Sequence, residues 1–226
     1  MLRVLRAVAD DDVFLVDGRG NRITGTLTGT DLPVALITIT AVEKDELEHR
    51  LPKIHLACGI IKNKRFEWAL EKSVELGASI ISPLLTDNSE ITPRQGKQQR
   101  WLTLLQTATK QSGRSLIPAL SNPIDLARFV EENSTASLFY GLARSRFEPA
   151  GNEIISVSDI ADKVTDKNQD LVWLVGPEGG WSDQELALLA DKAVAVRLGP
   201  HRLRTETAVA AGLSFLQSVA ERLNEL

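Results

Sequence analysis

The chain has 226 residues, of which 43% are hydrophobic and 25% charged, and it carries a formal net charge of −4. This balance is typical of a globular protein with a buried core, and it argues against a surface that is basic throughout. No apolar run approaches the ~20 residues of a membrane-spanning helix, and the amino terminus has no apolar signal core, so we expect a cytoplasmic protein with no membrane segment.

The supply of cysteine and histidine limits disulfides and metal sites. A single cysteine, Cys58, excludes a disulfide within the chain and a thiolate-rich metal site. The three histidines, His49, His55 and His201, are widely spaced and lack a nearby carboxylate pattern. We therefore expect no bound metal.

The first part of the chain has the pattern of an all-β unit. Two short apolar segments, residues 13–18 and 23–29, flank the turn at residues 17–20, and residues 34–42 then alternate apolar residues with threonine. Such alternation is typical of strands with one buried face. The charged stretch that follows, residues 43–53, predicts a linker or a short helix.

From about residue 54 onward, expected strands alternate with expected helices. The strands are predicted at residues 54–61, 81–86, 136–141, 171–175 and 193–199. Two helices are predicted at residues 65–78 and 100–112, a third is predicted to begin at Ser182, and a fourth is predicted to begin after residue 204. This alternation predicts an α/β fold with a mostly parallel sheet. Residues 145–170 are expected to be the most flexible stretch, with a polar loop or frayed helix at residues 159–168.

Two loops near the carboxyl end contain residues that a plain strand-to-helix connection does not need. GPEGG (residues 176–180) precedes a capping box at residues 182–185, and a longer polar loop (residues 199–207) precedes the last helix, with Thr205 or Thr207 as its expected N-cap. In an open α/β sheet, ligands bind at the carboxyl ends of the strands, so both loops predict a site there. Neither loop has the pattern of a P-loop or a dinucleotide-binding loop.

These loops and the segments before them also resemble one enzyme family. GPEGG, followed about twenty residues later by LGPHRLRTETA (residues 198–208), resembles the bacterial 16S ribosomal RNA uridine-N3 methyltransferases, the small-subunit methyltransferase E family of the SPOUT superfamily. The likeness extends to LRVLRA, FLVDGRGNR, KNKRFEWALEKSVELGASIISPLLTDNSEI and RWLTLLQTATKQSGRSLIPAL. It therefore covers nearly the whole chain.

The resemblance implies a fold and a domain division. It implies a SPOUT-type α/β knot, in which the last part of a mostly parallel sheet domain forms a deep trefoil knot, preceded by a small PUA-like β-barrel that holds RNA. On this basis, residues 1–50 form the barrel and residues 51–226 form the methyltransferase domain. The family's usual opening strand has no counterpart here, so either the barrel is incomplete or the start is truncated. The family also implies a homodimer.

The resemblance further implies S-adenosylmethionine as the methyl donor, bound in the knotted loops. Glycines would let backbone amides and carbonyls meet the adenine edge, and two leucines would hold its faces. Carried over by motif, the donor-binding residues are Leu174, Gly176, Pro177, Glu178, Gly179, Gly180, Leu198, Gly199, Leu203, Arg204, Thr205 and Thr207.

Methylation of uridine N3 requires the loss of the proton on that nitrogen. Cationic donors to the two neighbouring carbonyl oxygens would stabilise the anion that forms. Arg204 is the first candidate for this role and Arg114 the second. Glu206 is a candidate base, although its position at a helix start favours orienting Arg204. His201 is a weaker candidate, because a histidine in an exposed loop is common.

The chemistry also implies the substrate. N3 lies on the Watson–Crick edge, so the target uridine must be unpaired, within 16S ribosomal RNA or the small ribosomal subunit. Basic residues would hold the flanking phosphates. The predicted RNA contacts are Arg3, Arg6, Arg22, Lys62, Lys64, Arg65, Arg94 and Arg114.

Two other functions stay open at this point. A SPOUT ribose 2′-O-methyltransferase would usually have an Asn-Glu-x-x-Gly loop and a Ser-Leu-Asn segment, whereas here Pro177 precedes Glu178 and LRTETA replaces the latter segment. A non-catalytic RNA-binding or assembly factor that has kept the fold is the second alternative. The shortened amino terminus and the negative net charge leave room for this alternative.

Overall fold

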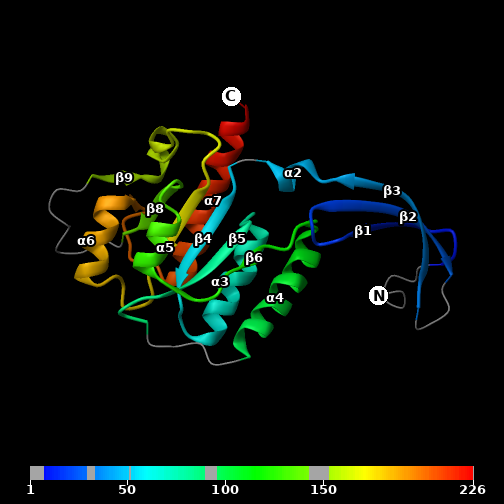
Figure 1. Ribbon diagram of the computed structural model, residues 1–226, viewed down its shortest axis with the longest axis horizontal. Helices are drawn as coiled ribbons and strands as arrows, with labels where there is room; N and C mark the ends of the chain where they lie inside the picture. The colour runs from blue at the N-terminus through cyan, green and yellow to red at the C-terminus, as the bar shows by residue number, and fades with distance from the viewer. Residues whose placement is uncertain (1–7, 30–33, 51, 90–95, 143–152, 226) are drawn as a thin grey trace. The chain divides into compact units, whose positions relative to one another are not determined.

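The computed structural model describes residues 8–29, 34–50, 52–89, 96–142 and 153–225, and the chain divides into two compact units (Figure 1). Unit 1 comprises Met1–His49 and Thr109–Ile117, and unit 2 comprises Arg50–Ala108 and Pro118–Leu226. The last turn of helix α4 (Lys97–Ser112) and the loop after it therefore belong with unit 1. The sequence pattern gave no sign of this second segment.

Unit 1 contains the three strands expected from the sequence. They are β1 (Asp12–Val16), β2 (Asn21–Gly29) and β3 (Leu36–Lys44), paired antiparallel in the order β1-β2-β3, and a short helix, α2 (Glu46–His49), follows. Phe14, Ile39 and Val42 are exposed, so this described part of unit 1 is an open antiparallel sheet. It is consistent with part of a barrel.

The second segment of unit 1 is tied to the sheet by a buried carboxylate. Asp45 accepts hydrogen bonds from the Ser115 hydroxyl at 2.7 Å and from Arg22 Nε at 2.8 Å. Burial opposes ionisation, but these two donors outweigh it and lower the pKa of the Asp45 carboxyl. Backbone hydrogen bonds join Gly20 to Ser115 and Gly18 to Ile117. Ser115 thus contributes to the fold of unit 1.

Unit 2 is built on a parallel sheet, as predicted. Its strand order is β6-β5-β4-β10-β8-β11-β9, with β7 paired to β5, and each of these pairings is parallel. The strands are β4 (Ile54–Gly59), β5 (Ile80–Leu85), β6 (Ala119–Leu120), β7 (Ile124–Asp125), β8 (Ser137–Gly141), β9 (Ile154–Ser156), β10 (Leu171–Val175) and β11 (Val194–Arg197). Every residue of β10 is buried, in keeping with its central place.

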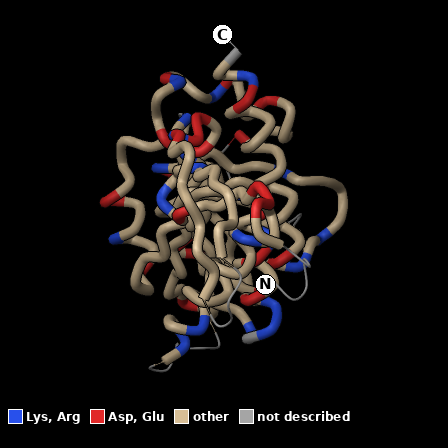
Figure 2. The backbone as a smooth tube through the Cα atoms, turned by 90° about the vertical axis from the view of Figure 1, so that its right-hand side faces the viewer, with Lys and Arg blue, Asp and Glu red and all other residues tan. Residues whose placement is uncertain are grey.

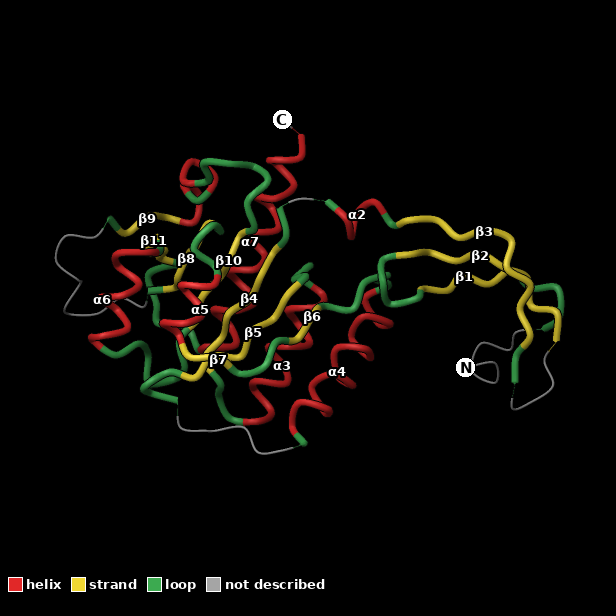
Figure 3. Tube along the Cα trace, viewed as in Figure 1, coloured by secondary structure: helices red, strands yellow, loops and turns green. Residues whose placement is uncertain are grey.

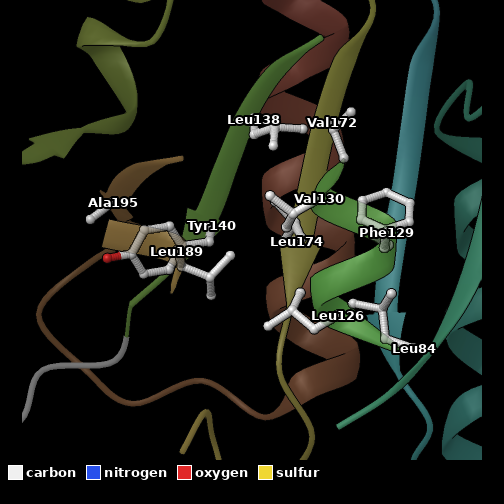
Figure 4. Close-up of a cluster of buried hydrophobic side chains, with 11 residues drawn as sticks. Leu84, Leu126, Phe129, Val130, Leu138, Tyr140, Val172, Leu174, Leu189 and Ala195 are labelled. Carbon is white, nitrogen blue, oxygen red and sulfur yellow. The ribbon is translucent and has the colours of Figure 1, made fainter. Parts of the chain in front are cut away.

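Helices cover both faces of this sheet. Helices α3 (Asn63–Glu75) and α7 (Thr205–Glu225) pack together, and α7 also packs on β10 and β4. Helices α5 (Leu126–Glu132) and α6 (Asp183–Lys192) pack together on the opposite face (Figures 1 and 4). Two short 3₁₀ turns occupy Val157–Asp159 and Ala161–Lys163.

The core beneath α5 joins that helix to the central strands. Phe129 and Val130 of α5 pack with Val172 and Leu174 of β10, and Tyr140 of β8 borders the same cluster (Figure 4). At 25–30 cal/mol per Å² of apolar surface removed from water, such burial is the main stabilising term for the sheet. It fixes the strand ends from which the site loops leave.

On the other face, α7 approaches β10 closely. Gly212 lies against the indole of Trp173, where a side-chain Cβ would clash, and Trp173 Nε1 donates to the Ala208 carbonyl at 3.1 Å. This contact sets the position of the first turns of α7. The helix already begins at Thr205, so neither Thr205 nor Thr207 precedes it, and the N-cap prediction for these threonines is wrong.

Part of the stretch expected to be flexible is ordered instead. Residues 154–156 form β9, which pairs with β11, and the two 3₁₀ turns follow it. A carboxylate cap also explains α5, which the sequence analysis missed, since the Asp125 side chain accepts from Arg128 N at 2.9 Å. The expected flexibility of residues 145–152 falls outside the described residues.

Candidate functional site

A pocket of about 660 Å³ lies at the carboxyl ends of β8, β10 and β11. Loops follow these strands in the chain trace (Figure 3). The two loops singled out in the sequence both contribute to it. We call residues 176–180 the GPEGG loop and residues 198–204 the Arg204 loop. The lining residues are Gly141, Leu142, Val175, Gly176, Pro177, Glu178, Gly179, Gly180, Trp181, Leu186, Leu198, Gly199, His201, Arg202, Leu203, Arg204, Thr205 and Ala208.

The GPEGG loop is held by close backbone approaches. A Cβ on Gly59 would lie 2.8 Å from the Pro177 nitrogen, and a Cβ on Gly179 would lie 2.8 Å from Asn88 Cβ. Gly180 has φ +75°, which favours glycine, and its amide donates to the Pro177 carbonyl at 2.9 Å. These glycines are therefore needed for the shape of the loop itself.

The start of α6 fixes the far end of the GPEGG loop. Ser182 and Glu185 form the predicted capping box, with Ser182 N donating to Glu185 at 2.8 Å and Glu185 N donating to the Ser182 hydroxyl at 3.2 Å. Glu185 also accepts from Asp87 N at 3.0 Å. This anchoring leaves the Trp181 side chain against the pocket, and its buried Nε1 has no hydrogen-bond partner among the described residues.

Two hydrogen bonds link the GPEGG loop to the Arg204 loop and α7. The Thr205 hydroxyl donates to the Gly176 carbonyl at 3.1 Å, and Arg202 Nη2 donates to the Glu178 carbonyl at 3.1 Å. Arg204 is exposed at the pocket, and within the described part of the chain its side chain has no ion pair or hydrogen bond. Its guanidinium is available to a ligand.

A charged cluster lies next to these loops. Arg65 Nη1 is 3.4 Å from Glu178 Oε1, and Arg65 Nε is 3.8 Å from Glu206 Oε1. The other oxygen of Glu206 is buried and has no hydrogen-bond partner among the described residues. Burial, reinforced by the charges of Glu178 and Glu206, raises the pKa of the Cys58 thiol. Cys58 is therefore a thiol at neutral pH and not a nucleophile.

The pocket contains ten of the twelve residues predicted to bind the donor. The other two lie elsewhere: Leu174 points into the core beneath α5 (Figure 4), and Thr207 is exposed on the first turn of α7. Of the catalytic candidates, Arg204 lines the pocket and Glu206 does not. Arg114 belongs to unit 1, where it is paired with Glu48 at 3.0 and 2.7 Å.

The predicted RNA contacts are distributed over both units. Lys62 and Lys64 are exposed at the start of α3, whereas Arg65 faces the two carboxylates and Arg22 is paired with Asp45. In the described part of the chain, basic and acidic residues are interspersed along the trace (Figure 2). Arg3, Arg6 and Arg94 lie outside the described residues.

Sequence reasoning missed several residues of the pocket. Gly141 is the last residue of β8, and Leu142 follows it. β8 neighbours β10 only because of the strand order, which no local pattern reveals. Trp181 directly follows GPEGG, so its position was a usable signal. The residues not anticipated are Gly141, Leu142, Val175, Trp181, Leu186, Arg202 and Ala208.

Neither a metal cluster nor a membrane helix accompanies the pocket in the described part of the chain. No group of three or more His, Cys, Asp or Glu residues there is arranged to hold a metal ion. No described helix is long and apolar enough to cross a membrane.

Comparison with known proteins assigns the family. The model of the RNA methyltransferase domain family matches residues 48–217. The ribosomal RNA small subunit methyltransferase E of Synechocystis is 30% identical over 221 residues, which cover 97% of this chain and 70% of that protein. The chain belongs to the small subunit methyltransferase E family. The Bacillus subtilis member of this family is 28% identical over 83% of the chain and 74% of its own length.

Solved structures of similar proteins have the same fold. A Legionella pneumophila methyltransferase in complex with S-adenosylmethionine has a TM-score of 0.75 and 30% identity, covering 96% of this chain and 86% of that chain. The small subunit methyltransferase E of Neisseria gonorrhoeae, bound to the same molecule, has a TM-score of 0.77 and 27% identity, covering 96% and 87%. The family identity predicted from the two loops is thus confirmed.

Proposed function

We propose that this protein transfers the methyl group of S-adenosylmethionine to N3 of a specific uridine in 16S ribosomal RNA of the small ribosomal subunit. The observation that carries the proposal is that the GPEGG loop and the Arg204 loop, about twenty residues apart in sequence, line one pocket. The family's name supports ribosomal RNA as the substrate, and the donor-bound relatives support S-adenosylmethionine.

The chemistry of the pocket fits this donor. A volume of about 660 Å³ is within the usual range of small-molecule sites. The walls combine glycine backbone, which offers amides and carbonyls, with apolar Leu198 and Leu203, which suit the faces of an adenine. Trp181, which lines the pocket, adds an indole Nε1 donor that has no partner among the described residues. A P-loop lysine is not required, because the donor carries no phosphate.

Arg204 is the residue that we assign to catalysis. The bound donor would supply an electrophilic methyl group, and the protein's part is to make the uridine nitrogen nucleophilic. A guanidinium directed at the carbonyl oxygens beside N3 lowers the pKa of that nitrogen and stabilises the anion. Its exposure and lack of a partner in the described residues support this role.

Two other catalytic assignments have less support. Glu206 does not line the pocket and lies beside Arg65, which favours an orienting role over that of a base. Arg114 forms a two-point pair with Glu48, and its side chain is only 11% exposed. Its role toward RNA or uridine stays a prediction.

We assign RNA phosphate binding first to Lys62 and Lys64. Both are exposed at the amino end of α3, where backbone amides add to the positive potential. No acidic residue lies in the first turn of this helix. These charges therefore favour an anion at the start of α3.

Four further features belong to the proposal. After β10 the chain passes β8 to form β11 on its far side, and α7 then returns to pack on β10 and β4. This path supports a trefoil knot in residues 171–226. The open sheet of β1, β2 and β3 supports a PUA-like barrel as the fold of residues 1–50, to which residues 109–117 contribute. Family membership supports a homodimer and action in the cytoplasm, where small subunits are assembled.

A methyl-transfer assay tests the function directly. Purified protein is incubated with labelled S-adenosylmethionine and small subunits, or naked 16S RNA, from cells that lack this modification. The RNA is then digested to nucleosides for mass analysis. We expect N3-methyluridine at one position. A ribose-methylated nucleoside would replace the proposal with the 2′-O-methyltransferase reading, and donor binding without transfer to either RNA would favour an assembly factor.

A further inference from the structure

Arg65 lies where two separate parts of the pocket wall meet. Its guanidinium contacts Glu178 of the GPEGG loop at 3.4 Å and Glu206 of the first turn of α7 at 3.8 Å. These carboxylates are 28 residues apart in sequence. Glu178 lines the pocket, and Glu206 is adjacent in sequence to Thr205, which also lines it. A single side chain thus contacts the segments that follow both β10 and β11.

The charge of Arg65 is already compensated inside the protein. Two carboxylates face one guanidinium, so this cluster has a formal charge of −1 and is a poor site for an RNA phosphate. Lys64, its neighbour on α3, is exposed and has no ion pair among the described residues. Lys64 and Arg65 are adjacent in sequence, but only Arg65 faces carboxylates in the described part of the chain.

We propose that Arg65 is a positioning residue, which holds the GPEGG loop and the start of α7 together so that the donor pocket keeps its shape. The proposal rests on the proposed function, because it assigns a role within the same site. Arg65 would then contribute to donor binding, and Lys62 and Lys64 to RNA binding.

The support for Arg65 on α3 is rigid. Phe66, the next residue, is 1% exposed and packs against Trp101 with ring centroids 4.8 Å apart. Helix α3 also packs along α7. The guanidinium therefore extends from a packed helix toward the GPEGG loop and the start of α7. Two hydrogen bonds that also join these segments are made by Thr205 and Arg202, which both lie on the carboxyl-terminal side of the junction.

The chemistry of the side chain suits this role. Glu206 is only 14% exposed, and its second oxygen is buried with no hydrogen-bond partner among the described residues. Removal of Arg65 would therefore leave the two carboxylates without the counter-charge that they now share. A forked guanidinium can reach two carboxylates at once, whereas a lysine ammonium is a single point. We therefore expect Arg65→Lys to restore the function only in part.

The first test needs no donor. Amide hydrogen exchange is measured on the purified full chain and on Arg65→Gln, with Arg128→Gln as a control that removes an exposed ion pair on α5. We expect faster exchange in residues 176–182 and 199–208 of Arg65→Gln alone, with unchanged protection in β4 and β10. Equal exchange of these segments in wild type and Arg65→Gln would overturn the proposal, whatever the protein methylates.

The second test separates positioning from charge. The donor is a net cation, so extra negative charge alone would tighten its binding, whereas a distorted pocket weakens both the donor and neutral S-adenosylhomocysteine. By calorimetry we expect Arg65→Gln to lower the affinity for both ligands about two- to tenfold, and Arg65→Lys to lower it less. The loss should shrink in the Glu206→Gln and Glu178→Gln backgrounds, because the partners are then absent.

RNA binding distinguishes a phosphate contact from a positioning residue. We expect Lys64→Gln to weaken RNA binding and to reduce the salt dependence of log K by about 0.7–0.9, and Arg65→Gln to leave both quantities near the wild-type values. If Arg65→Gln reduces the salt dependence and leaves both adenosyl ligands bound as in wild type, Arg65 is an RNA contact and the proposal is wrong. If the wild-type protein binds neither adenosyl ligand, the proposed function is wrong. The hydrogen-exchange comparison would still test whether Arg65 holds the two segments together.

Discussion

The three charged residues that the sequence offers as catalytic candidates have different surroundings in the structure. Arg204 is exposed at the pocket, Glu206 is mostly buried beside Arg65, and Arg114 is paired with Glu48 in unit 1. A group that stabilises developing charge has to reach the substrate in the transition state. This requirement separates Arg204 from the other two at the scale of single side chains.

Arg204→Ala should therefore reduce methyl transfer by at least about 100-fold, the usual cost of losing a donor to a developing anion. Because the side chain is exposed and unpaired in the described structure, the melting temperature should change little. Single-turnover assays with saturating donor measure the chemical step. Arg204→Lys, which keeps the charge and loses the fork, serves as the matched variant and should be intermediate. A wild-type rate in Arg204→Ala would contradict the assignment.

His55 links stability to pH at the same scale. It is 5% exposed, hydrogen-bonded to the Ser82 hydroxyl at 2.9 Å, and burial lowers its pKa from 6.5 to about 4. The folded state keeps this histidine neutral, so the unfolded chain binds the proton first as pH falls below 6.5. The contribution of neutral His55 to the free energy of unfolding is therefore fully present above pH 6.5. It is lost as the pH falls toward 4, which lowers the free energy of unfolding by roughly 2–3 kcal/mol.

Denaturant unfolding at a series of pH values from about 7.5 to 4.5 measures this effect. His55→Leu is the matched variant, because it removes the titrating group and leaves Ser82 paired with Ser121. Its free energy of unfolding should depend less steeply on pH in this window. The Asp45 carboxyl titrates lower, below its usual 3.8, so it does not obscure the comparison. Parallel curves for the two proteins would refute the role of His55.

At the scale of elements, local patterns were reliable where a segment makes its own structure. The capping box at Ser182 and the buried strand Leu171–Val175 were both predicted correctly. The misses arose where tertiary pairing decides. β9 has three residues and exists through its pairing with β11. Helix α5 has only seven residues, and its three buried ones share a core cluster with β10. Likewise, only strand order brings Gly141 to the pocket.

The contact between α7 and β10 gives a prediction for packing. In Gly212→Ala, the new Cβ would collide with the indole of Trp173, which is fully buried. Overpacking of this kind costs about 1–3 kcal/mol. Chemical denaturation should show this loss, together with weaker donor binding, since the same contact positions the start of α7. Ser214→Ala, at an exposed position of α7, should be near neutral. Unchanged stability in Gly212→Ala would show that α7 can shift freely.

The segment at residues 109–117 gives a second prediction for an element. Arg114 and Glu48 are 11% and 10% exposed, so Arg114→Ala would leave a carboxylate buried without its partner. We expect the free energy of unfolding of unit 1 to fall by roughly 3–5 kcal/mol. Faster amide exchange in β1 to β3 would measure this loss. Glu48→Gln should cost less, since it keeps a hydrogen-bond acceptor. A stable Arg114→Ala protein with impaired methyl transfer would return Arg114 to the catalytic candidates.

At the scale of the whole molecule, RNA recognition has to work against the net charge of −4. Basic and acidic residues are interspersed in the described part of the chain (Figure 2), so attraction to RNA depends on local groups of cations. Lys62 and Lys64, together at the amino end of α3, form such a group. Their effect must be separated from that of total charge.

A matched pair of double variants makes that separation. Lys62→Glu with Lys64→Glu, and Arg128→Glu with Lys167→Glu, each change the net charge from −4 to −8. If attraction is local, the first pair should weaken RNA binding by at least tenfold and reduce its salt dependence by roughly 1–2, since each phosphate contact contributes about 0.7–0.9. The second pair should lose far less. Donor binding should not weaken in the first pair, since neither lysine lines the pocket. Equal losses in the two pairs would mean that RNA responds to the total charge of the protein and that the start of α3 holds no phosphate.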